Sequence, residues 1–345
     1  MVEFAGFEMP VEYSGVTKEH LCVRNSVGIF DVSHMGEFIV EGEGALDLLQ
    51  YITTNDVSRA ETGQAQYNCL PNGKGGIVDD LIIYRLEEKK YMMVVNASNI
   101  EKDFDWVNKN NKFEADVSNI SADISLLAVQ GPRALNVLRK ITDVNLESIS
   151  SFYFETGTIA GIQNVIISAT GYTGAGGFEL YCKNKDVIKL WSAILEAGKD
   201  YEIQPIGLAA RDTLRLEKGY CLYGNDIDDN TSPLEAGLGW IVKLSKPDDF
   251  IDKKYLLNQK EQGIKRKLIG FELIDRGIPR QHYKIFSKDL KQIGEVTSGT
   301  MSPLMKKGIG MGYVSIEYAK KDTEIYIGIR NKMIQARIVS LPFIN

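Results

Sequence analysis

The chain has 345 residues, enough for two or three domains, and its 44% hydrophobic and 25% charged residues are ordinary values for globular proteins. A formal net charge of −6 argues against nucleic-acid binding. No apolar run approaches the roughly 18 residues of a membrane span, and the N-terminus lacks the segments of a secretory signal. The four cysteines and three histidines are scattered, so the sequence predicts no metal site and reduced thiols in the cytoplasm.

Helical and strand-like stretches alternate through the first 250 residues. Apolar spacing predicts helices at 17–27, 44–53, 98–110, 131–141, 186–198, 207–219 and 252–261. It predicts strands at 30–33, 65–70, 77–85, 90–96, 125–130, 164–170 and 177–182. Ser98 and Glu101 have the spacing of a capping box, which predicts that a helix begins there.

The pattern of predicted elements changes after Trp240, and beyond Lys265 only short strands separated by turn residues are predicted. Regular spacing of this kind indicates a small all-β barrel or sandwich. The predicted strands lie at 266–273, 281–287, 292–298, 309–316, 323–329 and 333–340.

Two carboxylates stand at the start of the strand that follows Gly75 and Gly76. Because side chains alternate along a strand, Asp80 shares one largely apolar face with Tyr84, and Asp79 lies on the other. A buried carboxylate must be hydrogen-bonded, paired or used in chemistry. One alternative is that one aspartate caps the turn and the other pairs with a Lys or Arg; the other is that Asp80 belongs to a functional site.

A glycine-rich turn at 171–177 precedes a predicted strand that carries Glu179. It is no dinucleotide loop, because Glu179 stands where the last glycine belongs and a strand follows. Such a turn presents a carboxylate that could pair with adjacent N–H donors on a ring edge. The alternative is a surface turn with a solvated glutamate.

Arg211 and Arg215 lie one turn apart on a predicted helix. Two cations at that spacing repel unless something neutralises them, so a buried carboxylate or an anionic ligand is expected. We expect one of them to be structural, paired with Asp79, Asp212 or Glu217. With no phosphate loop and no nucleophile elbow, the residues favour a flat, polar, partly aromatic ligand that carries its own chemistry.

Taken together, these segments resemble the aminomethyltransferase of the glycine cleavage system, the T-protein. The resemblance covers essentially the whole chain, with matching segments in family order at 4–10, 28–36, 54–56, 75–84, 96–99, 130–132, 171–179, 210–217, 223–226, 233–238 and 296–299. Family members usually begin about fifteen residues earlier, so the resemblance implies a truncation or a different start. Ile344 stands where the family often has a folate-contacting tyrosine.

The resemblance implies an α+β, three-domain clover-leaf fold with tetrahydrofolate in its central hole. Domain 1 would be 1–34 with 125–245, domain 2 would be 35–124, and domain 3 would be the β-barrel at 250–345. The implied reaction moves the methylene carbon of an aminomethyl group from the dihydrolipoyl arm of H-protein to tetrahydrofolate, which gives 5,10-methylenetetrahydrofolate and ammonia. The implied enzyme is a cytoplasmic monomer of glycine catabolism with no metal.

The resemblance also implies the site residues. Asp80 matches the key acidic residue, expected near the folate nitrogens, and Glu179 and Arg211 match folate-site residues. Further walls or polar contacts of the same hole are expected from Asn96, Tyr67, Tyr84, Met35, Tyr172 and Trp240.

Two competing functions use a similar fold: a folate-dependent demethylase of a sulfonium or methylated amine, and a non-enzymatic folate-binding protein linked to iron–sulfur clusters. The second carries a Lys-Gly-Cys-Tyr motif, whereas this chain has Lys218-Gly219-Tyr220-Cys221, an order that favours the transferase. The flavin-containing sarcosine dehydrogenases need a further domain, for which this chain has neither the length nor the glycine fingerprint.

Overall fold

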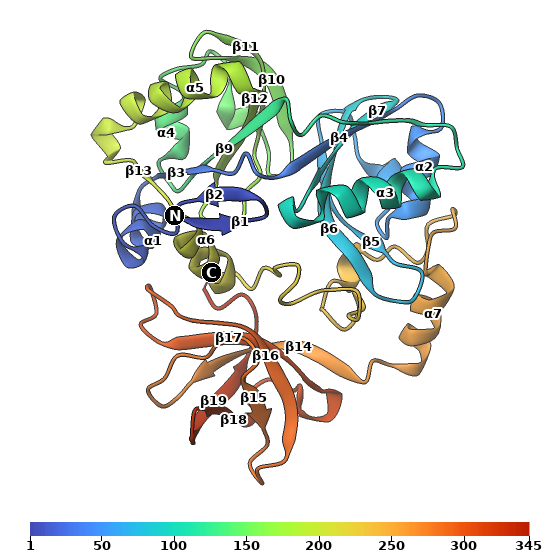
Figure 1. Cartoon of the computed structure of the whole chain (residues 1–345), viewed down its shortest axis with the longest axis vertical. Coiled ribbons are helices and arrows are strands. Elements are labelled where there is room, and N and C mark those ends of the chain that lie inside the picture. The colour runs from blue at the N-terminus through green and yellow to red at the C-terminus, as the bar shows by residue number, and fades with distance from the viewer. Residues whose placement is uncertain (345) are drawn as a thin grey trace. The chain divides into compact units, whose positions relative to one another are not determined.

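The computed structural model describes residues 1–344 and divides into two compact units (Figure 1). Unit 1 comprises residues 1–70, 79–211 and 247–250, and unit 2 comprises 71–78, 212–246 and the residues from 251 onward. The three-domain division stays a prediction. Among residues 1–344, no helix is both long and apolar enough to cross a membrane.

A six-stranded sheet in unit 1 has the order β10-β11-β12-β9-β3-β13. Its strands are β10 (Phe154–Ile159), β11 (Ile162–Ser168), β12 (Gly177–Lys183), β9 (Ile124–Gln130), β3 (Gly28–Asp31) and β13 (Gln204–Pro205). Helices α4 (Ala134–Leu138) and α5 (Asn184–Ala197) cover one face, where Leu180 packs in a core with Val129 and Leu190. Since side chains alternate, Glu179 and Tyr181 point to the opposite face of the sheet.

A five-stranded sheet in unit 1 has the order β5-β6-β7-β4-β8. Its strands are β5 (Ala65–Pro71), β6 (Ile77–Glu87), β7 (Lys90–Val95), β4 (Gly36–Glu41) and β8 (Asp116–Asn119). Helix α3 (Ile100–Asn110) packs on one face, with the rings of Phe38 and Phe104 5.3 Å apart, and α2 (Ala45–Ile52) contacts α3.

The inner faces of the two sheets meet around Tyr84 of β6. The Tyr84 ring centroid lies 5.5 Å from that of Tyr181 on β12 and 5.3 Å from that of Phe154 on β10. The sheet faces that carry Asp80 and Glu179 are therefore both directed toward the space between the two sheets.

Unit 2 contains a closed barrel of six strands in the order β14-β17-β16-β15-β18-β19. They are β14 (Arg266–Leu273), β15 (Lys284–Phe286), β16 (Gln292–Met301), β17 (Gly308–Ser315), β18 (Glu324–Ile329) and β19 (Lys332–Val339). Phe271, Ile285 and Ile325 are fully buried within it. The structure thus selects the barrel over the sandwich and confirms the α+β class.

The remaining helices and strands are short. They are β1 (Val2–Phe4), β2 (Phe7–Met9), α1 (Val16–Asn25), α6 (Leu208–Glu217), α7 (Lys253–Gln262) and the 3-10 turns η1 (Val57–Arg59), η2 (Ala97–Asn99), η3 (Leu146–Ser148), η4 (Lys199–Tyr201), η5 (Gly239–Ile241) and η6 (Ile316–Tyr318).

Two sequence predictions are wrong in detail. Helix α3 begins at Ile100 with Asn99 as its N-cap and no side-chain capping hydrogen bond, so the predicted capping box at Ser98 does not form. Helix α4 ends at Leu138 rather than near residue 141. The chain leaves the helix there because the Ile141 carbonyl accepts a hydrogen bond from the Ala160 backbone N–H instead.

Candidate functional site

Asp80 lies on the inner face of β6, where its side chain is partly exposed. Tyr67 donates a hydrogen bond from its hydroxyl to Asp80 Oδ2 over 2.8 Å, and Asn96 Nδ2 donates to Asp80 Oδ1 over 3.0 Å. Burial, with a smaller contribution from Asp79, raises the pKa of Asp80 to about 7, although the two hydrogen bonds oppose the shift. The carboxyl can therefore gain or lose a proton near neutral pH.

Asp79 occupies the outer face of β6 and is fully buried. It accepts hydrogen bonds from Asn96 N at 3.0 Å, Asn96 Nδ2 at 2.8 Å and Asn99 Nδ2 at 2.6 Å. Amide donors, rather than the Lys or Arg allowed for from the sequence, therefore hold this carboxylate. The Asn96 side chain touches both aspartates and couples the two faces of the strand.

Glu179 of β12 is 9% exposed and accepts a 2.5 Å hydrogen bond from the Thr170 hydroxyl. The Tyr84 hydroxyl is hydrogen-bonded to Thr170 at 3.1 Å and to Tyr181 at 2.9 Å. Burial raises the pKa of Glu179, while the Thr170 hydrogen bond and the Arg211 guanidinium oppose the shift. Tyr84 is fully buried, so we expect it to support the hydrogen-bonded cluster of Thr170, Tyr181 and Glu179 from inside the protein.

The two arginines of α6 have different surroundings. The Arg211 guanidinium carbon lies 4.6 Å from the centroid of the Tyr172 ring, an arrangement typical of a cation–π contact. Arg215 is buried and forms a 2.6 Å ion pair with buried Asp226. It also contacts Asp212 at 2.8 Å, which confirms the prediction that one of the two arginines is structural.

The other two predicted residues are placed as follows. Met35 is half-buried in the turn between β3 and β4 of unit 1. Trp240 belongs to η5 in unit 2 and exposes 61% of its surface.

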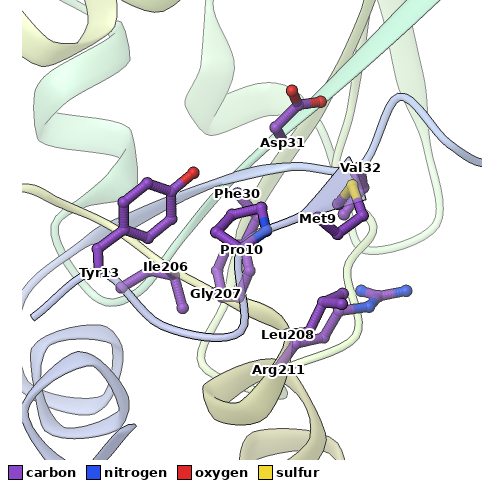
Figure 2. A pocket seen from close by; sticks show the side chains of 10 residues that line it. All are labelled: Met9, Pro10, Tyr13, Phe30, Asp31, Val32, Ile206, Gly207, Leu208 and Arg211. Carbon is purple, nitrogen blue, oxygen red and sulfur yellow. The ribbon is translucent and has the colours of Figure 1, made fainter. Parts of the chain in front are cut away.

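A small cavity in unit 1 has Arg211 at one side, and Figure 2 shows the side chains around it. Pro10, Phe30 and Leu208 are among its apolar lining residues. Its volume of about 10 Å³ suits a single water and is too small for an aromatic ring. This cavity therefore lies beside Arg211 and is not a binding site for an aromatic ring.

A larger cavity of about 330 Å³ lies elsewhere in unit 1. It is lined by Asp47, Gln50, Tyr51, Lys112, Phe113, Asp248 and Asp249, none of which the sequence predicts as a site residue. The site is therefore defined by its hydrogen-bonded carboxyl groups and not by either of these cavities.

Two buried carboxyl groups close to the site were not predicted. Glu37 of β4 is 1% exposed and neither of its oxygens receives a hydrogen bond from residues 1–344. Asp103 of α3 is fully buried, neither of its oxygens receives a hydrogen bond from residues 1–344, and burial together with the Asp79 charge raises its pKa to about 11. Asp103 could have been found from the sequence, because it lies one turn before Val107 on the apolar face of α3.

Comparison with known proteins agrees with this architecture. Residues 1–246 match the model of the GCVT N-terminal domain, and residues 266–345 match that of the glycine cleavage T-protein C-terminal barrel domain. An aminomethyltransferase of Bacteroides fragilis is 56% identical over 343 residues, 99% of this chain and 95% of its own. An aminomethyltransferase of Porphyromonas gingivalis is 56% identical over 346 residues, with the same coverage of both chains.

A solved structure extends the agreement to three dimensions. The crystal structure of the glycine cleavage system aminomethyltransferase T of Bartonella henselae superposes with a TM-score of 0.92 at 36% identity, covering 99% of this chain and 93% of that one. The chain belongs to the glycine cleavage T-protein family.

Proposed function

We propose that this chain moves the methylene carbon of an aminomethyl group from the dihydrolipoyl arm of H-protein to tetrahydrofolate, which yields 5,10-methylenetetrahydrofolate and ammonia. The chain is an aminomethyltransferase of the glycine cleavage system, as its curated relatives at 54–56% identity and its structural counterpart are. Beyond that activity, we propose tetrahydrofolate as the acceptor, H-protein as the carrier protein, and the roles of the residues described below.

The Asp80 carboxyl is the single observation that carries the proposal. Expulsion of the lipoyl sulfur leaves a methylene iminium cation on the transferred group. A carboxylate already fixed by Tyr67 and Asn96 stabilises that positive charge without reorganising, an effect typically worth about 3 kcal/mol. Because the Asp80 pKa lies near 7, the same group can also exchange a proton with a folate nitrogen during ring closure.

The surrounding residues have the chemistry that a folate needs. Glu179 offers a carboxylate to the adjacent N–H groups of a pteridine edge, and Arg211 offers a cation to the carboxylates of the glutamate tail. Within unit 1, Tyr172 and Met35 would supply ring and thioether walls. We assign Tyr67 and Asn96 to Asp80 rather than to folate, because the hydrogen bonds of both reach that carboxyl.

Further parts of the proposal concern the whole chain. We propose a cytoplasmic monomer without a metal, divided into domains at 1–34 with 125–245, at 35–124 and at 250–345. The acidic net charge of the chain argues for a partner other than nucleic acid.

One assay tests the proposal against its competitors. Purified chain is mixed with aminomethyl-loaded H-protein, with and without tetrahydrofolate, and ammonia is measured. We expect ammonia release that depends on folate. Folate binding without any stimulation would instead indicate the non-enzymatic relative, and methyl transfer from a sulfonium would indicate the demethylase.

A further inference from the structure

The Gln130 side chain lies at the end of β9, on the sheet face that also carries Glu179. It is buried, and its neighbour across the ladder is Gly177 of β12. A Cβ added to Gly171 would stand 2.0 Å from Gln130 Oε1. The absence of a side chain at Gly171 therefore lets the glycine-rich turn at 171–177 lie directly against the buried amide.

Hydrogen bonds join the Gln130 amide to three places along the segment 170–178. Gln130 Nε2 donates to the Thr170 carbonyl over 3.1 Å and to the Phe178 carbonyl over 3.4 Å. Gln130 Oε1 accepts a 2.8 Å hydrogen bond from the Thr173 hydroxyl. One buried amide therefore uses both its donor and its acceptor atoms to hold the two ends and the middle of this segment.

Other hydrogen bonds hold the tip of the turn independently of this amide. Arg24 Nη1 of α1 donates to the Thr173 carbonyl over 2.6 Å, and the Ala175 N–H donates to the Thr173 hydroxyl over 3.2 Å. The Gly131 N–H donates to the Gly176 carbonyl over 2.8 Å. We therefore expect a change at the amide to shift the segment without unfolding the sheet that carries it.

The segment carries two contacts of the candidate site. The Thr170 hydroxyl donates the 2.5 Å hydrogen bond to Glu179 Oε2. Tyr172 lies between Thr170 and Thr173, and its ring faces the Arg211 guanidinium at 4.6 Å. An amide that fixes the Thr170 carbonyl and the Thr173 hydroxyl therefore fixes the backbone on both sides of Tyr172.

We propose that Gln130 is a positioning residue whose amide holds the segment 170–178 in the conformation that presents Tyr172 and Glu179 to tetrahydrofolate. Gln130 acts through the turn and not on the reacting atoms. The inference about folate rests on the proposed function, whereas the inference that the amide holds the turn does not.

Two variants remove these hydrogen bonds with little change in side-chain shape. Gln130→Met removes all three, and Thr173→Val removes the hydroxyl alone. Gln163→Met makes the same chemical change as Gln130→Met at an exposed position of β11 in the same sheet and serves as the matched control. Thermal unfolding is measured for each variant, and Thr173→Val decides the question if Gln130→Met does not fold.

The first readout is hydrogen–deuterium exchange of the segment 170–178, measured by mass spectrometry without any ligand. We expect exchange at least about fivefold faster in Gln130→Met and about twofold faster in Thr173→Val, with the exchange of β9 unchanged. Gln163→Met should exchange as the wild-type chain does. Exchange of the segment at the wild-type rate in the folded variants would overturn the inference.

The second readout is the affinity for tetrahydrofolate, measured by equilibrium titration and by the kinetics of ammonia release. Gln130→Met should weaken binding and raise KM for folate at least about tenfold, with kcat at saturating folate within about threefold of wild type. Thr173→Val should raise KM about threefold in the same way. Gln163→Met should change neither constant.

These measurements separate positioning from simple structural support. A purely structural role would lower the unfolding temperature of Gln130→Met and leave the folate affinity of the folded variant unchanged, which would overturn the proposal. If the wild-type chain binds no tetrahydrofolate, the proposed function fails, but the exchange rates still decide whether the Gln130 amide holds the turn.

Discussion

Several buried carboxyl groups in unit 1 have raised pKa values, and Glu37 is the clearest example. It pairs with Val94 of β7, which in turn pairs with Ile82 of β6, so the carboxyl lies on the inner face two strands from the Asp80 strand. Burial raises its pKa to about 8, and neither oxygen receives a hydrogen bond from residues 1–344. At neutral pH the group is therefore held as a neutral acid.

This predicts a dependence of stability on pH. The folded state keeps a proton that the unfolded state loses above about pH 4.5, so stability should fall by up to about 1.4 kcal/mol per pH unit until about pH 8 and then level off. Glu37→Gln should flatten that decline in denaturant unfolding between pH 5 and 8. Glu43→Gln, an exposed change in the same region, should leave the decline as it is; equal slopes in wild type and Glu37→Gln would contradict the argument.

Glu179 allows a second test at this scale. If its carboxylate accepts two N–H groups of folate, Glu179→Gln should weaken tetrahydrofolate binding by about tenfold or more, because a charge-assisted pair is lost. Equilibrium titration measures the affinity. Glu155→Gln, an exposed change on β10 of the same sheet, is the matched control; unchanged affinity in Glu179→Gln would remove this residue from the folate site.

At the scale of elements, the close approach of α3 to β4 decides where Asp103 lies. A Cβ added to Gly36 would stand 2.6 Å from Ile100 Cγ1 and 2.8 Å from Val95 Cγ2. Only a glycine allows the helix to come this close to the sheet without a shift. The helix then buries its Asp103 carboxyl where the Asp79 charge contributes to the raised pKa of Asp103.

Gly36→Ala should therefore destabilise the chain and also disturb the site. We expect a loss of about 1–3 kcal/mol in the free energy of unfolding, the usual effect of overpacking, and a slower turnover because α3 moves. Chemical denaturation and the ammonia assay measure the two effects. Gly239→Ala, where an added Cβ would meet only Leu234 at 3.4 Å, should change neither by more than a small amount.

The sequence predicted many elements of the fold but missed several strands, among them β4, β8 and β10. Long apolar stretches such as 77–85 and 125–130 were placed correctly, because buried strands have an unmistakable composition. In β4, Glu37 and Glu41 interrupt the apolar pattern, and only the structure shows that Glu37 is buried. The electrostatic influence of Asp79 on Asp103 depends on tertiary packing, which no local spacing encodes.

At the scale of the whole molecule, unit 2 has its own buried electrostatic centre. Asp226 is fully buried and accepts hydrogen bonds from Arg215 at 2.6 Å and from the hydroxyls of Thr297 and Ser298 on β16. Arg215 also donates to the Ser298 hydroxyl over 2.8 Å. This network joins the end of α6 to the barrel inside unit 2.

Breaking this network should be costly. Arg215→Met leaves Asp226 charged, buried and unpaired, so we expect the free energy of unfolding to fall by about 3–5 kcal/mol. Differential scanning calorimetry detects the loss, and Arg276→Met at an exposed position is the control. A shift no larger than that of the control would show that the ion pair contributes nothing to stability.

The most direct test of the central claim is the rate of folate-dependent ammonia release from aminomethyl-loaded H-protein in a single turnover, compared between the wild-type chain and Asp80→Asn at pH 7. If the Asp80 carboxylate stabilises the developing cation, the variant should bind tetrahydrofolate normally and release ammonia about 10²–10³-fold more slowly. A folded variant that binds folate and retains the wild-type rate would contradict the account.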